Sequence, residues 1–221
     1  MIITIDGPAA AGKGTLSAAL AERYHLAYFD TGMLYRAVGL AMVLQNQNPQ
    51  DEPAAEKIAK ELTFAKMMRL SQHPEFRGRL GGEAASKVSA LPKVRAALLK
   101  MQQDFADNPV FADGTPANGA VYDGRDTGTV VCPHADIKFF VVASPEVRAK
   151  RRYNEFIAKG MQTTYQQVLD DLIARDKRDS ERSAAPLKPA DDAFLLDTST
   201  MDINQEIAAA IEIIEQKFPH K

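Results

Sequence analysis

The first fifteen residues constrain the fold more than any other stretch of the chain. A short β-branched run at residues 2–5 predicts a buried strand. It leads into the pattern Gly-x-x-x-x-Gly-Lys, and a helix-compatible run follows from Leu16 to Tyr24. In such a strand–loop–helix unit, backbone N–H groups and the positive end of the helix dipole face phosphate oxygens. A plain glycine-rich turn is the alternative, but the spacing, the lysine and the flanking elements together favour a phosphate-binding loop.

The residue after the lysine narrows the class of phosphate-binding loop. Most such loops carry Ser or Thr there, whereas this chain has Gly14 and places its hydroxyl at Thr15. Gly-Lys-Gly-Thr is typical of small-molecule kinases. We expect Lys13 to follow the β- and γ-phosphates of ATP and Thr15 to hold Mg²⁺ directly or through water, although its hydroxyl could simply satisfy the first helical turn. The expected ATP-binding loop is Gly7, Pro8, Ala9, Ala10, Ala11, Gly12, Lys13, Gly14 and Thr15.

The composition sets broad limits on partners and location. The 221 residues carry a formal net charge of −2, so nothing draws the whole surface toward nucleic acid or an acidic membrane. No apolar run approaches the roughly 18 residues that a membrane helix needs. Cys132 is the only cysteine, which excludes an intramolecular disulfide and fits a reducing cytoplasm. We therefore expect a cytoplasmic monomer that binds neither a nucleic-acid polymer nor a membrane.

Strand and helix patterns alternate along most of the chain, which predicts an α/β fold with a parallel sheet covered on both faces. Further strands are expected at residues 26–29, 120–122, 137–142 and 194–197. Helices are expected at residues 33–44, from Ser144 to Gly160, from Thr164 to Arg182, and along an isoleucine stripe from Ile203 to Phe218.

Residues 54–108 resemble an insertion into this alternating pattern. We expect a surface loop at residues 45–56, a helix running into a strand at 57–64, and a basic, glycine-containing segment at 76–82. Residues 83–105 are predicted to be mostly helical with an interruption near Pro92, and residues 106–119 to form a loop.

Asp123 follows the predicted strand at 120–122. Ligands of parallel sheets gather at the carboxyl ends of the strands, so this carboxylate could order Mg²⁺-bound water. A cap on the following turn is the alternative interpretation.

Arginines recur at three distant places in a chain with almost no net charge. Arg36 and Arg95 are suited to clamp an acceptor phosphate, because a guanidinium fork matches phosphate oxygens. Arg175, Arg178 and Arg182 recur at i, i+3 and i+7, so they are expected to share one helical face. That face could close over phosphates as a lid, although a charge run by itself is more often a solvated helix face.

These motifs in this order resemble those of bacterial cytidylate kinases. The likeness covers nearly the whole chain, and two blocks carry most of its specificity: Gly124-Arg125-Asp126-x-Gly-Thr-Val-Val and Arg175-Asp-x-Arg-Asp179. The resemblance implies transfer of the γ-phosphoryl group of ATP to CMP or dCMP with Mg²⁺. It also implies an adenylate-kinase-like fold with a five-stranded parallel core at residues 1–53, 106–150 and 183–221, a CMP-binding insertion at 54–105, and a helical lid at 151–182.

The same resemblance implies individual roles. The residues that match CMP-binding positions are Thr31, Tyr35, Arg36, Ser86, Arg95, Arg125, Asp126, Arg175, Asp179 and Arg182. Arg151 matches the lid arginine that faces ATP. The implied catalytic residues are Lys13, Arg125, Arg178 and Arg182, and the implied metal-site residues are Thr15 and Asp123. Two segments depart from the family pattern: residues 106–119 are longer than expected, and residues 76–82 match poorly.

Other functions of a phosphate-binding loop remain as alternatives. A kinase for UMP, AMP or a small alcohol such as shikimate is the nearest, and the Gly-Arg-Asp block speaks against shikimate. A nucleotide switch or binding protein without kinase chemistry is more distant. Switches usually carry Ser or Thr directly after the lysine and an Asn-Lys-x-Asp motif, and the sequence has neither.

Overall fold

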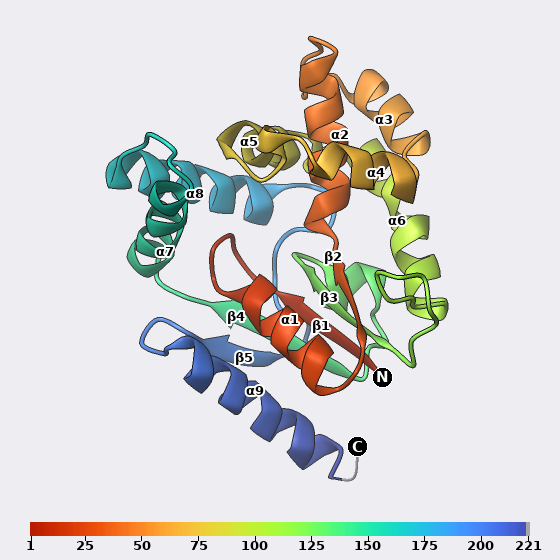
Figure 1. Ribbon diagram of the computed structural model, residues 1–221, viewed down its shortest axis with the longest axis vertical. Helices are drawn as coiled ribbons and strands as arrows, with labels where there is room; N and C mark the ends of the chain where they lie inside the picture. The colour runs from red at the N-terminus through yellow and green to blue at the C-terminus, as the bar shows by residue number, and fades with distance from the viewer. Residues whose placement is uncertain (220–221) are drawn as a thin grey trace.

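Five parallel strands form one sheet in the order β2-β3-β1-β4-β5 (Figure 1). The computed structural model describes residues 1–219. The strands are β1 (Ile2–Asp6), β2 (Ala27–Asp30), β3 (Ala120–Gly124), β4 (Ile137–Val142) and β5 (Phe194–Asp197). The predicted fold class and the five predicted strands are therefore confirmed.

The strand register brings three carboxylates to one edge of the sheet. Asp6 pairs with Gly124, and Asp30 pairs with Asp123, at the carboxyl ends of β1, β2 and β3. Because these strands are parallel and end level with one another, the loops that follow them open on the same side. The register thus decides where the functional site lies.

Helices cover both faces of the sheet and extend beyond its carboxyl edge. They are α1 (Lys13–Arg23), α2 (Gly32–Leu44), α3 (Glu52–Lys60), α4 (Phe64–Ser71), α5 (Arg79–Val88), α6 (Pro92–Asp107), α7 (Pro145–Ala158), α8 (Tyr165–Glu181) and α9 (Ile203–Lys217). A 3₁₀ turn, η1 (Pro74–Phe76), precedes α5, and a π-helical turn, η2 (Thr127–Val131), follows β3.

The alternation of side chains along the strands builds two cores. Ile3 and Ile5 point to the face covered by α1 and α9, where they pack with Leu16 and Ile214. Tyr122 points to the other face and packs in the larger cluster that joins the sheet to α2 and α6. In Figure 1, α2 to α6 lie above and to the right of the sheet, and α7 and α8 lie to its left.

The two helices on the left begin where their capping residues predict. The Ser144 hydroxyl accepts a hydrogen bond from the backbone N–H of Val147 at the start of α7. Thr164 and Gln167 form a capping box at the start of α8. Gly160 lies just beyond α7 with φ of 71°, the left-handed conformation that ends helices.

The segment from residue 45 to 82 is more helical than the sequence predicts. Helix α3 already begins at Glu52, inside the predicted loop, because the Asp51 side chain caps it. No strand forms within residues 57–64, since Thr63 caps the separate helix α4. The basic segment at 76–82 enters α5 at Arg79. Side-chain caps at Asp51 and Thr63 thus explain the two corrections at α3 and α4.

Helix α9 buries most of its predicted isoleucine stripe. Ile214 is buried, and Ile207, Ile211 and Phe218 are partly buried against the same core, whereas Ile203 is 50% exposed. Glu206 and Ala210 are buried as well, so a carboxylate stands beside the stripe.

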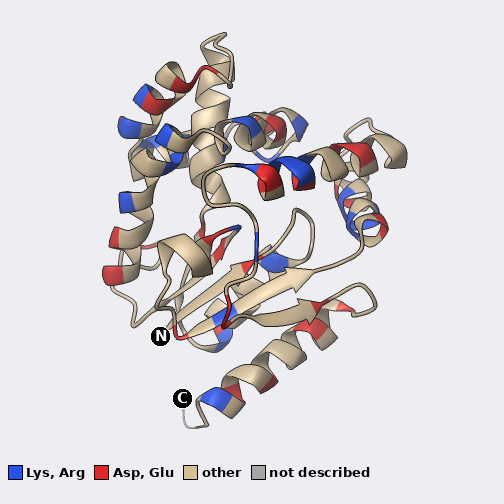
Figure 2. Cartoon of the chain, turned by 180° about the vertical axis from the view of Figure 1, so that it is seen from behind, with Lys and Arg blue, Asp and Glu red and all other residues tan. Residues whose placement is uncertain are grey.

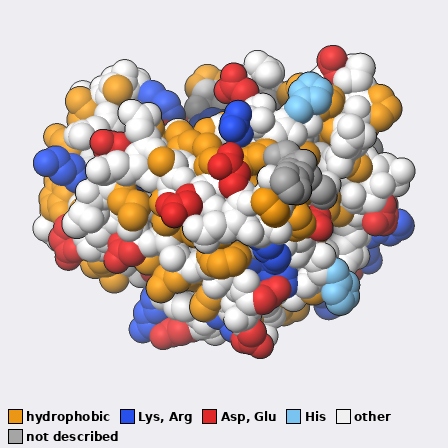
Figure 3. Space-filling model, turned by 90° about the horizontal axis from the view of Figure 1, so that it is seen from below, with side chains coloured by type: hydrophobic (Ala, Val, Ile, Leu, Met, Phe, Trp, Pro, Cys, Tyr) orange, Lys and Arg blue, Asp and Glu red, His pale blue; other side chains and the backbone are white. Residues whose placement is uncertain are grey.

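Charges of both signs are spread over the surface. Figure 3 shows hydrophobic, acidic and basic side chains interspersed on the face seen from below. Figure 2 shows acidic and basic positions next to one another along the second half of α8. Among the residues that the structure describes, no helix is both long and apolar enough to cross a membrane.

Candidate active site

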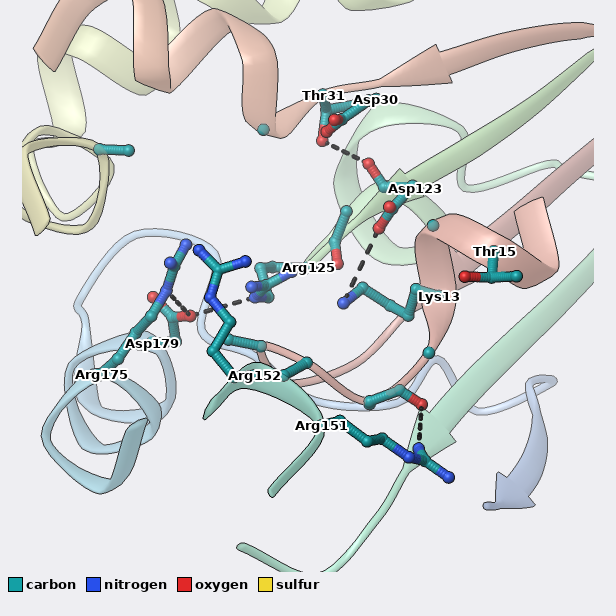
Figure 4. Close-up of a pocket in the computed structure, with 18 of the residues that line it drawn as sticks. Lys13, Thr15, Asp30, Thr31, Asp123, Arg125, Arg151, Arg152, Arg175 and Asp179 are labelled. Carbon is teal, nitrogen blue, oxygen red and sulfur yellow. Dashed lines mark hydrogen bonds and ion pairs between the residues drawn. The ribbon is translucent and has the colours of Figure 1, made fainter. Parts of the chain in front are cut away.

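A cavity of about 950 Å³ opens at the carboxyl edge of the sheet. Its wall is formed by the glycine-rich loop, the ends of β2 and β3, and parts of α2, α6, α7, α8 and α9. Figure 4 shows Lys13, Arg125, Arg152 and Arg175 pointing into this common space. The cavity therefore collects most of the residues that the sequence singles out. Those that line it are Ala9, Ala10, Ala11, Gly12, Lys13, Gly14, Thr15, Thr31, Tyr35, Arg36, Arg95, Asp123, Arg125, Asp126, Arg151, Arg175, Asp179 and Arg182.

The glycine-rich loop has the backbone shape that a phosphate cradle needs. Gly12 has φ of 104° and directly precedes α1, whose helical residues begin at Lys13. Gly7 has φ of 151°, and a side chain there would clash with the backbone of Val141. The free N–H groups of the first turn of α1 consequently face the cavity.

Lys13 is a buried cation with few partners. Its ammonium donates to the carbonyl of Pro8 at 2.9 Å and lies 3.8 Å from an oxygen of Asp123. Burial, and next the charge of Arg125, lower the pKa of Lys13 to about 8. An ammonium destabilised in this way gains from an anion placed beside it.

Asp123 and Thr15 fit a magnesium site of the kind that relies on substrate phosphates. Asp123 is largely buried beside Lys13, and burial raises its pKa while Lys13 opposes the shift. Asp30 and the exposed hydroxyl of Thr15 line the same cavity. Mg²⁺ takes oxygen ligands and is commonly held by one or two carboxylates together with phosphates and water. The donor set therefore fits Mg²⁺.

A buried polar cluster forms the end of the cavity near α6. Arg95 donates to a carboxylate oxygen of Asp126, and the second oxygen of Asp126 lies 3.8 Å from Arg182. The guanidinium of Arg95 also stands 5.3 Å from the centre of the Tyr35 ring. Nη2 of Arg182 is buried without a hydrogen-bond partner. Arg95 therefore fixes the Asp126 carboxylate, and Nη2 of Arg182 remains as an unused hydrogen-bond donor.

Asp179 holds two further arginines at the mouth of this cluster. Arg125 donates to Asp179 at 3.1 Å, and Nε of Arg175 lies 3.7 Å from the same oxygen (Figure 4). Burial and then Arg125 lower the pKa of Arg175 to about 9. Burial and then Arg152 lower the pKa of Arg36 to about 10. These cations outnumber the carboxylates near them, so the cavity is prepared for a polyanion.

Asp6 fixes the turn that carries Arg125 and Asp126. Its carboxylate accepts hydrogen bonds from the backbone N–H groups of Thr127 and Gly128, at 2.8 Å each, and from the Thr127 hydroxyl. Burial raises the pKa of Asp6 to about 6, although these hydrogen bonds favour its ionised form. The end of β1 thus sets the position of the loop after β3.

Four predicted site residues do not line this cavity. Gly7 and Pro8 belong to the first part of the glycine-rich loop, and Ser86 and Arg178 lie between α5 and α8. Nε of Arg178 donates to the Ser86 hydroxyl at 3.1 Å, and both line a smaller cavity of about 140 Å³ between α5 and α8. Arg175 lines both cavities, and Arg182 lines only the larger one. The three arginines therefore do not present one common surface, because α8 is in contact with α5 on one side and with the active-site cavity on the other.

Arg151 is engaged with the protein itself. It donates to Ala11, Thr198 and Met201 and so joins the glycine-rich loop to the segment before α9. Figure 4 shows its guanidinium directed at one backbone oxygen. It still lines the cavity, as predicted for a residue near ATP.

Sequence reasoning missed several residues of the cavity wall. They include Tyr28, Asp30, Arg77, Arg152, Glu155, Met201, Asp202, Ile203 and Glu206. Asp30 directly precedes Thr31, and Arg152 directly follows Arg151, so both stand next to predicted site residues. The residues near α9 gave no signal, since only the fold brings residue 206 beside residue 12.

Comparison with known proteins places this geometry in a family. The family model described as cytidylate kinase matches residues 3–216. The chain belongs to the cytidylate kinase family. A cytidylate kinase of Xanthobacter autotrophicus is 53% identical over 218 residues, covering 98% of each chain. One of Rhodopseudomonas palustris is 51% identical over 218 residues, covering 97% of this chain and 96% of the relative. The resemblance to the cytidylate kinase family that the sequence suggested is thus confirmed.

The fold also has a more distant solved relative. An uncharacterized protein from Eubacterium ventriosum aligns with a TM-score of 0.55 at 13% identity, covering 97% of this chain and 98% of the other. This likeness concerns the fold alone.

Proposed function

We propose that the protein transfers the γ-phosphoryl group of ATP to CMP or dCMP, giving ADP and CDP or dCDP. The observation that carries this proposal is geometric: Lys13, Arg36, Arg125, Arg175 and Arg182 line one cavity at the carboxyl edge of the sheet. Lysine and arginine outnumber the acidic side chains in its wall, so nucleotide phosphates would balance the excess positive charge. Burial lowers the pKa of Lys13, Arg36 and Arg175 in the same direction. Family membership and the curated relatives named cytidylate kinases support the same reaction.

The chain's own residues would position the two nucleotides for in-line transfer. The glycine-rich loop and Lys13 would bind the triphosphate, and Arg36, Arg125 and Arg182 would bind the acceptor phosphate. Phosphoryl transfer is catalysed mainly by such positioning and by electrostatic stabilisation. Arg125 and Arg175 would remain fixed by Asp179, so little reorganisation is needed when charge develops on the transferred group.

Asp123 and Thr15 would hold Mg²⁺ at the phosphates, with Asp30 nearby. When bound, the ion would supply positive charge to the phosphates of the donor. Lys13 lies beside Asp123, so its ammonium would act on the same phosphates.

Asp126 would read the cytosine base. A carboxylate accepts a hydrogen bond from the exocyclic amine of cytosine, which uracil lacks. Arg95 fixes the orientation of this carboxylate. In this assignment residues 54–105 bind the acceptor and residues 151–182 act as the lid, with Ser86 and Arg178 at the contact between the two.

A single panel of acceptors tests the proposal. Purified protein, ATP and Mg²⁺ are incubated with CMP, dCMP, UMP, AMP or shikimate, and ADP formation is followed by a coupled assay. We expect kcat/KM for CMP to exceed that for UMP and AMP by at least tenfold. Preferred use of UMP, AMP or shikimate would show that CMP is not the main acceptor. ADP formation at the same rate without any acceptor would overturn the assignment as a kinase.

A further inference from the structure

Glu206, in the first turn of α9, is a buried carboxylate without a partner. It is 2% exposed, and its Oε1 is shielded from solvent without a hydrogen bond. Among the described residues, no ion pair or hydrogen bond reaches either of its carboxyl oxygens. Burial raises the pKa of Glu206, and the nearby charges of Arg151 and Lys13 oppose this shift. Buried carboxylates are normally paired, so this one requires an explanation.

Packing does not provide that explanation. Glu206 occupies the first place in the line that Ala210 and Ile214 continue, where α9 meets α1. An apolar residue would fill the same place without the cost of desolvating a carboxyl group. The carboxyl also stands so close to Gly12 that a Cβ there would lie 2.8 Å from Oε2. The glycine-rich loop therefore leaves this group in contact with its backbone.

The position of Glu206 places it at the ATP end of the cavity. In Figure 4, Lys13 lies between Thr31 at the acceptor end and Arg151 at the opposite end. Arg151 donates to the carbonyl of Met201, and Met201 and Glu206 line the same cavity. Since the triphosphate belongs on the glycine-rich loop, the nucleoside of the donor must lie toward this opposite end.

The surroundings of Glu206 suit a nucleoside. Ile203 is 50% exposed, and Met201 is half-buried, so both offer apolar surface to a purine ring. The terminal bond of a glutamate side chain rotates easily, so either oxygen can turn to a ligand. A carboxyl group accepts hydrogen bonds from N–H or O–H groups.

We propose that Glu206 is a specificity-determining residue that accepts a hydrogen bond from the nucleoside of ATP, either from the exocyclic amine of the base or from a ribose hydroxyl. This inference rests on the proposed function and names how its donor site selects the nucleotide. Glu206 is then unpartnered in this structure because the nucleoside of ATP supplies the missing hydrogen-bond donor.

The test compares three variants across four donors. Glu206→Val removes the acceptor, Glu206→Gln keeps one, and Glu212→Gln is the control on the exposed side of the same helix. The donors are ATP, purine riboside triphosphate, which lacks the amine, 2′-deoxyATP and 3′-deoxyATP. The measurements are Kd by calorimetry, the donor KM at saturating CMP, and the thermal unfolding midpoint.

For Glu206→Val we expect Kd and KM for ATP to rise roughly tenfold while the unfolding midpoint stays the same or rises. One analogue should bind the variant and the wild type equally, and that analogue identifies the contacted group. Glu206→Gln should stay within about threefold of the wild type. If the valine variant does not fold, the glutamine variant should rank the four donors in the same order, with smaller changes in Kd and KM.

Two results would overturn the inference: unchanged ATP affinity in Glu206→Val, or an equal loss for all four donors, which indicates a structural role. Failure of the proposed function is distinguishable, because the wild type would then bind ATP in a Glu206-dependent manner without forming CDP.

Discussion

The buried Arg148 on α7 and the partly exposed Asp176 on α8 form an ion pair with 2.7 Å between Nη2 and Oδ2. The same guanidinium donates to the carbonyl of Ala9 at 3.2 Å and to that of Ala143 at 2.9 Å. One side chain therefore joins the glycine-rich loop, the end of β4 and the helix that carries Arg175, Asp179 and Arg182. Arg148 therefore links α8 directly to the glycine-rich loop.

The first prediction concerns that pair. Asp176→Ala leaves the buried Arg148 without its charge partner, so we expect a loss of about 1–3 kcal/mol in the free energy of unfolding. It should also lower kcat, because α8 is no longer held against the loop. Asp170→Ala, an exposed change on the same helix, is the control. A double-mutant cycle of Asp176→Ala, Arg148→Met and the double variant measures the interaction energy between the two side chains, from unfolding and from kcat. Strictly additive effects of the two substitutions would contradict the interaction.

The second prediction concerns base recognition. Asp126→Asn keeps the size of the side chain and removes its charge, which weakens the contacts to Arg95 and Arg182. We expect KM for CMP to rise by more than tenfold while Kd for ATP changes by less than threefold. Initial rates with CMP, dCMP, UMP and AMP measure this. An equal loss on all four acceptors would argue against reading of the base.

The third prediction concerns Arg182. Its side chain is only 2% exposed, and Nη2 has no hydrogen-bond partner, so the group is available to the transferred phosphoryl group. Arg182→Ala should lower kcat by more than tenfold with an unchanged circular-dichroism spectrum. Lys177→Ala, an exposed position on α8, should leave kcat unchanged. Turnover at the wild-type rate in Arg182→Ala would contradict the role.

The fourth prediction uses the pKa of Lys13, which burial lowers from 10.5 to about 8. Between these values the unfolded chain holds a proton that the folded chain has lost, so the contribution of Lys13 to stability rises with pH from about 8 to 10.5. The difference in unfolding free energy between wild type and Lys13→Gln should shift in favour of the wild type over this range. A difference independent of pH would show that Lys13 titrates normally.

The sequence predicts the elements of the core well because their signals are local. The strand before Gly7 and the caps at Ser144 and Thr164 each lie within a few residues of the structure that they determine. The start of α3 was missed because proline and polar residues near Asp51 resemble a loop as closely as they resemble a capped helix start.

The residues of the candidate site likewise fall into those that local sequence predicts and those that depend on tertiary packing. The places of Lys13 and Asp123 in the cavity wall could be predicted, because Lys13 belongs to the glycine-rich motif and Asp123 lies at the end of β3. The contact of Arg178 with Ser86, and the position of Glu206 beside Gly12, depend on how α8 and α9 are rotated against their neighbours. Helical periodicity shows which residues share a face, but it does not say which surface that face meets.

The central claim is direct transfer of a phosphoryl group between two nucleotides, and labelled ATP tests it most directly. The protein is incubated with Mg²⁺ and ATP carrying ³²P at the γ-position, with and without CMP, and the products are separated. We expect the label to appear in CDP only when CMP is present, and we expect Lys13→Gln to abolish this transfer. Label released as inorganic phosphate at a rate independent of CMP would contradict the account.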